Sequence, residues 1–380
     1  MDTASRRVAG SNCWGKFSVS GMSASSEPPS AVSTVKPEPP GLLWLDRNQP
    51  NALNFLRLIF ATAVLFTHNW TLGGFGPDPL NQPVASLGGI GAIAVNGFFS
   101  ISGFLIMGSW LSRRDADSYL RARVTRIWPA FVVAFFISLL IAAFAAGDGW
   151  LRYLRSIPKQ SYVVGAFTLD PFELERPLSF PHNPYPKTVN GSMWTIRIEF
   201  CCYMAVALAG CIGVFRRRWL VALFTAFAIC LAAYEQHFLP EVAWLRWARF
   251  AAYFGAGALL YLYRTHIPKS AWLALLCLGL LCTANYVSPY FTGPLAGTYL
   301  IFYLAYAAPA WMKKIGAKND ISYGVYLYAF PLQQLYFSYG VRHALPMNPW
   351  ISFATVLPLC VACGWLSWLY VEKPAKHRLR

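Results

Sequence analysis

The sequence predicts an all-α fold, a polytopic membrane helix bundle of about ten transmembrane helices with both ends of the chain in the cytosol. Apolar residues make up 56% of the 380 positions and charged residues only 13%, about half the charged share of a soluble domain. From residue 52 onward, apolar runs follow one another, and the 32 lysines and arginines gather in alternate connections between them, against 16 acidic residues. This composition disfavours a soluble enzyme, a disordered chain and a secreted disulfide scaffold.

The first segment of the chain is polar. Residues 1–40 are rich in Ser, Pro and Gly and contain no run apolar and long enough to be a signal peptide. A segment of this composition cannot bury enough apolar surface to fold by itself. We therefore expect a disordered cytosolic tail at 1–45, a membrane domain at 46–375 and a short basic cytosolic tail at 376–380.

Ten apolar runs are long enough to cross a bilayer, for which roughly 20 helical residues are needed. Because the fifth and sixth runs can be divided differently, nine to eleven spans fit the pattern. The runs cover residues 52–70, 88–110, 127–147, 193–214, 219–236, 246–263, 271–287, 294–311, 321–340 and 350–370.

The distribution of positive charge predicts the orientation. With the N-terminus inside, most lysines and arginines fall in inner connections, whereas the outer loops 71–87 and 288–293 hold none. This bias is typical of an even number of spans with both ends in the cytosol. The basic residues lie between apolar runs. The excess of positive charge therefore indicates contact with membrane lipid and not binding of nucleic acid.

One outer segment, 148–192, is long and rich in proline and aromatic residues. A loop of this length is usually a functional element, such as a lid or a substrate-binding segment, or else it is disordered. Eight of the nine cysteines lie within apolar runs and lack metal-ligand spacing. They are expected to be small core residues, so neither a metal site nor a disulfide is predicted.

Ionisable residues inside a span are costly and mark candidate sites. Arg57 and His68 are eleven residues apart in the first run, so on a helix they lie about 20° from one face and about 16 Å apart along it. Both can therefore face one bundle interior, with Arg57 near the inner end and His68 near the outer end. The alternatives are an arginine that extends to the cytosolic interface and a packed or interfacial histidine.

The fourth run contributes Arg197 and Glu199, at i and i+2 and therefore on different faces. At a depth similar to that of His68, the Glu199 carboxylate can support the imidazolium that forms when the histidine accepts a proton. The alternative is a structural ion pair with an arginine of another helix.

The inner end of the third run carries Arg123 and Arg126, which share a helical face. Two guanidinium groups at the inner surface suit phosphates, although they also fit charge that sets topology and attracts anionic lipid. In the second run, Ser102 and Gly103 are small and favour close helix packing, while a hydroxyl can also bind substrate. No base lies near Ser102 in the sequence, so a serine-nucleophile triad is not supported.

Six motifs follow one another along residues 50–375. They are Arg57 with His68, FFSISGFLI (98–106), Arg123 and Arg126 followed by I-x-P, SMWTIRIEF (192–200), ISYGVYLYAFP (321–331) and VEKP (371–374). Together they resemble the acyltransferase-3 family of bacterial integral-membrane O-acyltransferases. Two positions depart from the family pattern: Ala329 stands where many members have a histidine, and Thr195 replaces the usual serine.

The resemblance implies an O-acetyltransferase of the bacterial inner (plasma) membrane that moves an acyl group, commonly acetyl, from its coenzyme A thioester to a hydroxyl of a cell-envelope or exported glycan. It makes His68 the catalytic histidine, Glu199 a carboxylate of the family motif, and Arg57, Arg123 and Arg126 donor-side groups. The implied partners are acyl-CoA, a glycan or lipid-linked sugar acceptor and membrane lipid. The membrane domain alone is expected, without an appended soluble domain.

We therefore expect acyl-CoA to bind with its phosphates at the cytosolic face and its thioester near His68. His68 either removes the acceptor proton or is itself briefly acylated. Candidates for the walls of the substrate channel are Ser102, Trp194, Arg197 and Tyr323. A transporter or flippase of a sugar lipid is the alternative function, and a membrane scaffold without chemistry is hard to reconcile with so many ionisable residues inside spans.

Overall fold

The structure is a computed structural model that describes residues 44–46, 48–113, 115–146, 149–170, 179–238, 246–286 and 288–377. Most of the predicted tail 1–45, part of the predicted loop 148–192 and the last three residues lie outside these ranges. All regular elements in the described residues are helical, as the sequence predicts.

The main helices coincide with the ten expected apolar runs. Their bounds are α1 (Leu53–Gly73), α2 (Gly89–Arg113), α3 (Ala116–Ala145), α6 (Trp194–Cys211), α7 (Arg218–Phe238), α8 (Arg246–Leu262), α9 (Ala271–Cys282), α11 (Thr298–Ala307), α13 (Ser322–Arg342) and α14 (Pro349–Ser367). Shorter helical segments connect or extend them: η1 (Gln82–Leu87), α4 (Trp150–Ser156), α5 (Lys159–Thr168), η3 (Val214–Arg216), η4 (Thr283–Asn285), α10 (Pro289–Thr292), η5 (Gly293–Gly297), α12 (Ala310–Lys314), η6 (Trp368–Glu372) and α15 (Lys373–His377).

Six of the described helical segments are long and apolar enough to cross a membrane. They are Leu53–Gly73, Gln82–Arg113, Ala116–Ala145, Trp194–Cys211, Arg218–Gln236 and Pro349–Lys376. Among the rest, α13 is 21 residues long but carries two glutamines and five tyrosines, and α9 is an apolar helix of only 12 residues. The chain is therefore an integral membrane protein, while ten spans and a cytosolic position for both ends remain predictions.

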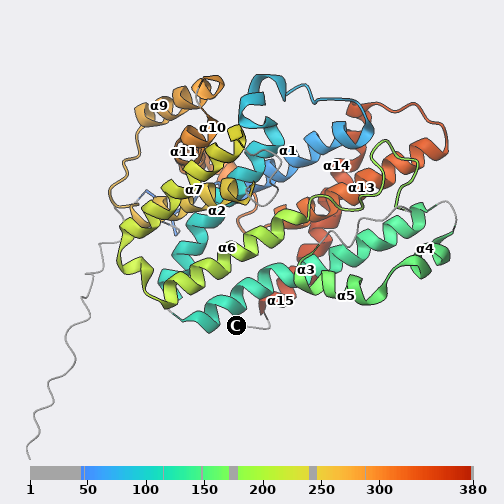
Figure 1. The fold of residues 1–380 in the computed structure, drawn as a ribbon, viewed down its shortest axis with the longest axis horizontal. Coiled ribbons are helices and arrows are strands. Elements are labelled where there is room, and N and C mark those ends of the chain that lie inside the picture. The colour runs from blue at the N-terminus through green and yellow to red at the C-terminus, as the bar shows by residue number, and fades with distance from the viewer. Residues whose placement is uncertain are drawn as a thin grey trace, which may run out of the picture. The chain divides into compact units, whose positions relative to one another are not determined.

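The outward surface of the bundle is apolar, as expected for helices in lipid. Leu223, Phe224 and Phe227 on α7 are 57–63% exposed, and Trp272 on α9 is 82% exposed. Large exposed apolar areas of this kind mark contact with a membrane or a partner. The core consists of the facing sides of the helices, with α1 lying beside α2, α13 and α14 (Figure 1).

Glycines allow α2 and α8 to cross at close range. A Cβ atom at Gly103 would lie 1.9 Å from the carbonyl oxygen of Phe254, and one at Gly257 would lie 2.0 Å from that of Ser100. Side chains larger than hydrogen therefore cannot be accommodated at this crossing without moving the backbones apart. This confirms the packing role predicted for Gly103.

Two helix ends differ from the sequence prediction. The third apolar run predicts a helix from residue 127, but α3 begins at Ala116, where Asp115 accepts a hydrogen bond from the Ser118 backbone N–H. This hydrogen bond lowers the pKa of Asp115. Pro129 lies inside the helix, and α15 continues to His377, past the predicted boundary at 375.

The described residues of the long segment 148–192 form α4 and α5 beside α3 (Figure 1) and a stretch of turns and bends at 179–192 that is fixed to α13. Asn183 donates hydrogen bonds to the backbone and side-chain oxygens of Gln334. Gln334 donates in return to the carbonyl oxygens of Tyr185 and Thr188, and Asn190 donates to that of Leu327. The described part of this segment is thus an ordered wall that ends at Ser192, beside His68.

Candidate functional site

Three cavities follow one another through the bundle. The imidazole cavity, of about 180 Å³, is lined by Val64, Thr67, His68, Gly91, Ala92, Val95, Gly191, Ser192, Trp194, Thr195, Arg249 and Tyr326. The middle cavity, of about 30 Å³, is lined by Arg57, Val95, Phe98, Phe99, Thr195, Ile196, Glu199, Ser322, Tyr323 and Tyr326. The arginine cavity, of about 440 Å³, is lined by Arg57, Ile101, Ser102, Leu105, Ile106, Arg113, Asp117, Ser118, Arg121, Ala122, Arg123, Thr125, Arg126, Tyr203 and Lys376.

Shared lining residues show which cavities are neighbours. Arg57 lines both the arginine cavity and the middle cavity. Val95, Thr195 and Tyr326 line both the middle cavity and the imidazole cavity. Arg57 therefore stands where the arginine and middle cavities meet, and His68 lines the cavity at the far end of the series.

His68 is held by contacts from two sides of its ring. The ring lies edge-on against Phe330, with centroids 5.3 Å apart, and Nδ1 is 3.4 Å from the Ser192 hydroxyl. This contact leaves Nε2 without a hydrogen-bond partner in the described residues. The imidazole can therefore exchange a proton with a molecule in the cavity.

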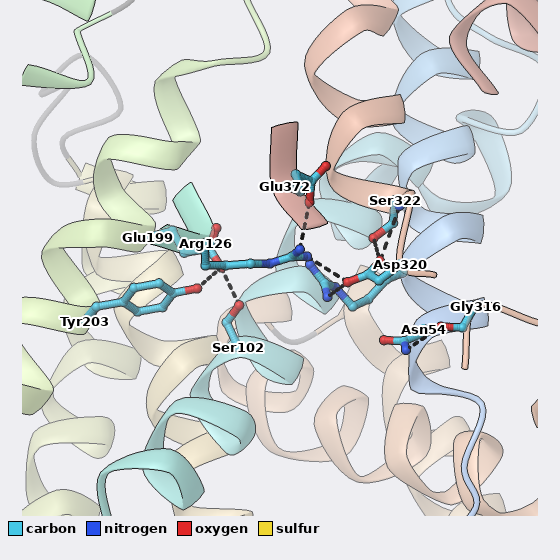
Figure 2. A network of polar contacts seen from close by, with 10 residues as sticks. Asn54, Ser102, Arg126, Glu199, Tyr203, Gly316, Asp320, Ser322 and Glu372 are labelled. Carbon is cyan, nitrogen blue, oxygen red and sulfur yellow. Dashed lines mark hydrogen bonds and ion pairs between the residues drawn. The ribbon is translucent and has the colours of Figure 1, made fainter. Parts of the chain in front are cut away.

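The expected support of His68 by Glu199 is not found in this structure. Glu199 Oε1 instead accepts hydrogen bonds from the hydroxyls of Ser102 and Tyr203, each at 2.5 Å (Figure 2). The reason is depth along α6. Thr195 reaches the imidazole cavity, while Glu199, one turn and about 6 Å further along the helix, lines the middle cavity. The structure thus brings a carboxylate to Ser102 from 97 positions away, a pairing that sequence proximity could not reveal.

Two of the three arginines expected to bind the donor are engaged by carboxylates. Asp320 forms ion pairs with Arg57 at 2.5 Å and Arg126 at 2.7 Å, and Glu372 pairs with Arg126 at 2.8 Å. Figure 2 shows Arg126 reaching between the two carboxylates, which come from the start of α13 and from η6. We refer to Arg57, Arg126, Asp320 and Glu372 as the Asp320 cluster.

Ionisation of Asp320 is favoured by its surroundings. Burial by itself would raise the pKa of this carboxyl, but the Arg57 and Arg126 guanidinium groups outweigh burial and hold the pKa well below its ordinary range. The Ser322 hydroxyl also donates a hydrogen bond to Asp320 Oδ1. Sequence reasoning missed Asp320, which directly precedes the ISYGVYLYAFP motif, and Glu372, which lies inside the VEKP motif.

Arg123 differs from its neighbour Arg126 because it has no carboxylate partner in the described part of the chain. Its guanidinium lies over the rings of Tyr119 and Tyr203 and is 3.4 Å from the Ser109 hydroxyl. Its Nε atom is buried without a hydrogen-bond partner. Arg123 is therefore better placed than Arg57 or Arg126 to meet an incoming anion, together with Arg113, Arg121 and Lys376 on the cavity wall.

Three of the four channel candidates line a cavity. Ser102 lines the arginine cavity, Tyr323 the middle cavity and Trp194 the imidazole cavity. Arg197 lines none of these three and forms an ion pair with Asp170 at 2.9 Å, with 44% of its side chain exposed. No group of three or more His, Cys, Asp or Glu side chains in the described residues could hold a metal ion.

Arg249 is a cavity residue that the sequence did not reveal. Arg249 lies inside the expected run 246–263, which starts where α8 starts, but as a basic residue in the first turn of that run it counts with the charge of the outer connection. The structure places it in the wall of the imidazole cavity.

Comparisons with known proteins agree with the resemblance in the motifs. A family model described as an acyltransferase domain matches residues 51–369. The chain is 26% identical over 336 residues to an "O-acetyl transferase" of Shigella phage Sf6, a match that covers 86% of this chain and 96% of the phage protein. It is 28% identical over 368 residues to "Nodulation protein 10" of Rhizobium leguminosarum bv. viciae, covering 86% and 93% of the two chains. No solved structure matches.

Proposed function

Since this chain belongs to the acyltransferase-3 family of membrane O-acyltransferases, we propose that it moves an acetyl group from cytosolic acetyl-CoA to a hydroxyl of a cell-envelope or exported glycan at the bacterial inner membrane. The series of three cavities carries this proposal, because it joins an arginine-rich mouth to a histidine near the far end of α1. The phage relative named for O-acetyl transfer supports acetyl as the group that is moved.

The donor end of the proposed path is the arginine cavity. The phosphates of acetyl-CoA bind at Arg123, with Arg113, Arg121 and Lys376 adding positive charge around them. Guanidinium groups suit phosphate because they donate two parallel hydrogen bonds. Arg57 and Arg126 have another part in this proposal: held by Asp320 and Glu372, they form the inner wall of the mouth.

The pantetheine arm then runs past Arg57 through the middle cavity. At about 30 Å³ this cavity holds about one water molecule, so donor binding requires its wall to widen. Tyr326 and Phe98 line the narrow part, and rotation of such side chains is the smallest movement that opens it. Glu199, Ser102 and Tyr203 line the path between the two larger cavities and hold one another by hydrogen bonds.

The transfer itself takes place in the imidazole cavity. The acceptor oxygen attacks the thioester carbonyl carbon while a ring nitrogen of His68 takes the hydroxyl proton. The carbon–sulfur bond then breaks, the carbonyl re-forms, and the protonated imidazole gives its proton to the coenzyme A thiolate. A positioned general base typically contributes about 10²–10⁴-fold to the rate, and orientation of the two substrates contributes further. Brief acylation of His68 itself is a second route with the same residues.

The test is direct. Purified protein in lipid nanodiscs is given [¹⁴C]acetyl-CoA, and envelope glycans of cells with and without the protein are compared by mass spectrometry. We expect thioester consumption by the protein and an acetyl group on a glycan hydroxyl only in cells that contain it. Intact acetyl-CoA together with ATP-independent movement of a sugar lipid between leaflets would contradict acyl transfer and favour a flippase.

A further inference from the structure

Two of the residues that line the imidazole cavity carry a buried polar atom with no partner in the described residues. These atoms are the Thr67 hydroxyl, on the residue before His68, and Nε of Arg249 on α8. Buried polar atoms in proteins are nearly always hydrogen-bonded, and an unpaired one calls for an explanation such as a ligand. Two of them on residues that line the cavity of the candidate catalytic base suggest that something else pairs with them there.

The state of Thr67 is unusual within its own helix. The hydroxyls of Thr62 and Thr71 on α1 donate to the carbonyl oxygens four residues earlier, at 3.0 and 3.3 Å. Such back-bonding is the ordinary way in which a threonine within a helix satisfies its hydroxyl. The hydroxyl of Thr67 makes no such bond in the structure. Gly91 leaves room beside it, since a Cβ atom there would lie 3.1 Å from the Thr67 oxygen.

Arg249 is unusual among the arginines near the bundle core. Arg57 and Arg126 are each paired with a carboxylate, and Arg123 donates a hydrogen bond to the Ser109 hydroxyl. Arg249, by contrast, forms neither an ion pair nor a hydrogen bond with any described residue, and its guanidinium lies 4.6 Å from the ring centroid of Phe250. A guanidinium group inside the bundle is costly without a counter-charge. The position of Arg249 therefore favours a ligand that becomes negatively charged in this cavity.

The cavity is small enough to bring these groups to one ligand. A volume of about 180 Å³ corresponds to about six water molecules, and His68, Thr67 and Arg249 all line it. A group that gives its proton to His68 therefore lies within a few atoms of the other two side chains.

We propose that Thr67 and Arg249 form the oxyanion site for acyl transfer, an inference that rests on the proposed function. When the acceptor oxygen bonds to the thioester carbon and His68 takes the proton, the carbonyl oxygen gains the electron pair of its π bond. The Thr67 hydroxyl and the Arg249 guanidinium donate hydrogen bonds to this oxygen. On collapse, the electron pair re-forms the carbonyl, the carbon–sulfur bond breaks, and His68 returns the proton to the thiolate.

Preorganised donors of this kind are among the largest contributions to catalysis, because they stabilise charge that develops only in the transition state. The pair also fits an oxyanion better than a permanently charged acceptor. The neutral Thr67 hydroxyl, next in sequence to His68, can donate one directed hydrogen bond to a single oxygen atom. A carboxylate or phosphate would be bound better by a second cation in its place.

The experiment compares two reactions of the same purified protein in nanodiscs: acetyl transfer to isolated envelope glycan, and hydrolysis of [¹⁴C]acetyl-CoA with water as the acceptor. Both reactions pass through the same oxyanion. For Arg249→Met we expect kcat to fall by about 10²–10³-fold in both, and for Thr67→Val by about tenfold. The Kd for acetyl-CoA should stay unchanged, and Arg249→Lys should recover part of the loss.

Arg217→Gln and Thr355→Val are the matched controls, since both residues are exposed and line none of the three cavities. If Arg249→Met lowers transfer to glycan but leaves hydrolysis unchanged, Arg249 recognises the acceptor and the oxyanion site is wrong. If neither reaction changes in a variant that keeps the wild-type melting temperature, the inference is also wrong. Should the wild-type protein consume no acetyl-CoA, the proposed function itself fails, an outcome distinct from both.

Discussion

His68 is the side chain whose removal should stop the chemistry and leave the fold intact. It lies at a cavity wall, where its ring packs against the Phe330 ring and its Nδ1 is 3.4 Å from the Ser192 hydroxyl. We expect His68→Ala to lower acetyl transfer by at least about 10²–10⁴-fold while the amount of protein in the membrane stays at the wild-type level. His266→Ala, at an exposed position, should retain full activity. Substantial transfer by the His68 variant would assign the proton transfer to another group.

Arg123 and Arg126 are three residues apart but should respond differently to substitution. Arg123 lacks a carboxylate partner in the described residues, whereas Arg126 has two. We expect Arg123→Ala to weaken acetyl-CoA binding by about ten- to a hundredfold, the value of a lost charge-assisted hydrogen bond, with little change in melting temperature. Arg126→Ala should mainly lower the melting temperature. Isothermal titration and a thermal unfolding assay measure the two effects, and unchanged donor affinity of the Arg123 variant would remove Arg123 from the phosphate site.

The sequence could predict single residues where the signal was local. Arg57 and His68 share a helix face because eleven residues make about three full helical turns. Both line cavities in the interior of the bundle, as predicted. The partners of these residues could not be predicted in the same way. Asp320 is 263 positions from Arg57, and Ser102 is 97 positions from Glu199, so only the packing of helices determines which side chains meet.

At the scale of helices, the Asp320 cluster joins α1, α3, η6 and the segment that leads into α13. Removal of one partner of a buried ion pair leaves the others uncompensated and typically costs about 3–5 kcal/mol. We therefore expect Asp320→Asn to lower the free energy of unfolding by about this amount, as measured by thermal or denaturant unfolding in detergent.

The pH dependence of this effect has a definite sign. Because the pKa of Asp320 is lowered in the folded protein, its stabilisation is complete above the ordinary carboxyl pKa. The stabilisation is lost only as pH falls through the lowered value. Wild type should thus remain more stable than Asp320→Asn throughout pH 5 to pH 8, and a difference that disappears within this range would contradict the ion pairs.

The crossing of α2 and α8 gives a second test at this scale. A Cβ atom at Gly257 would lie 2.0 Å from the Ser100 carbonyl oxygen, while one at Gly279 on α9 would meet nothing within 4 Å. We expect Gly257→Ala to destabilise the protein by about 1–3 kcal/mol through overpacking. Gly279→Ala should be neutral or slightly stabilising, since alanine favours helix. Equal melting temperatures of the two variants would show that the helices can separate at little cost.

Helix positions were the most predictable feature of the fold. Each of the ten apolar runs coincides with a helix, because apolar composition over such lengths has few other outcomes in a membrane. Helix ends were less predictable: α3 starts at Ala116, where Asp115 caps a polar segment that the hydropathy of the sequence did not include. The start of α8 at Arg246 agrees with the expected run 246–263, so Arg249 was missed for another reason: hydropathy does not tell which face of a helix lines a cavity.

For the whole molecule, the order of the cavities predicts that the two substrates approach from opposite faces. The arginine cavity and the imidazole cavity are joined only through the middle cavity in the described structure. In proteoliposomes sorted by orientation, we expect acetyl-CoA to be consumed only when it is supplied on the face that exposes Arg123. Arg123→Ala proteoliposomes serve as the control. Equal consumption from both faces would rule out a single entrance for the donor.

The narrow middle of the bundle also matters to the cell when no reaction is under way. A space of about 30 Å³ has room for about one water molecule and not for the chain of water molecules along which protons hop. Without bound substrate, the protein should therefore not let protons leak through the membrane. It can modify an acceptor at the far face without a permanently open channel.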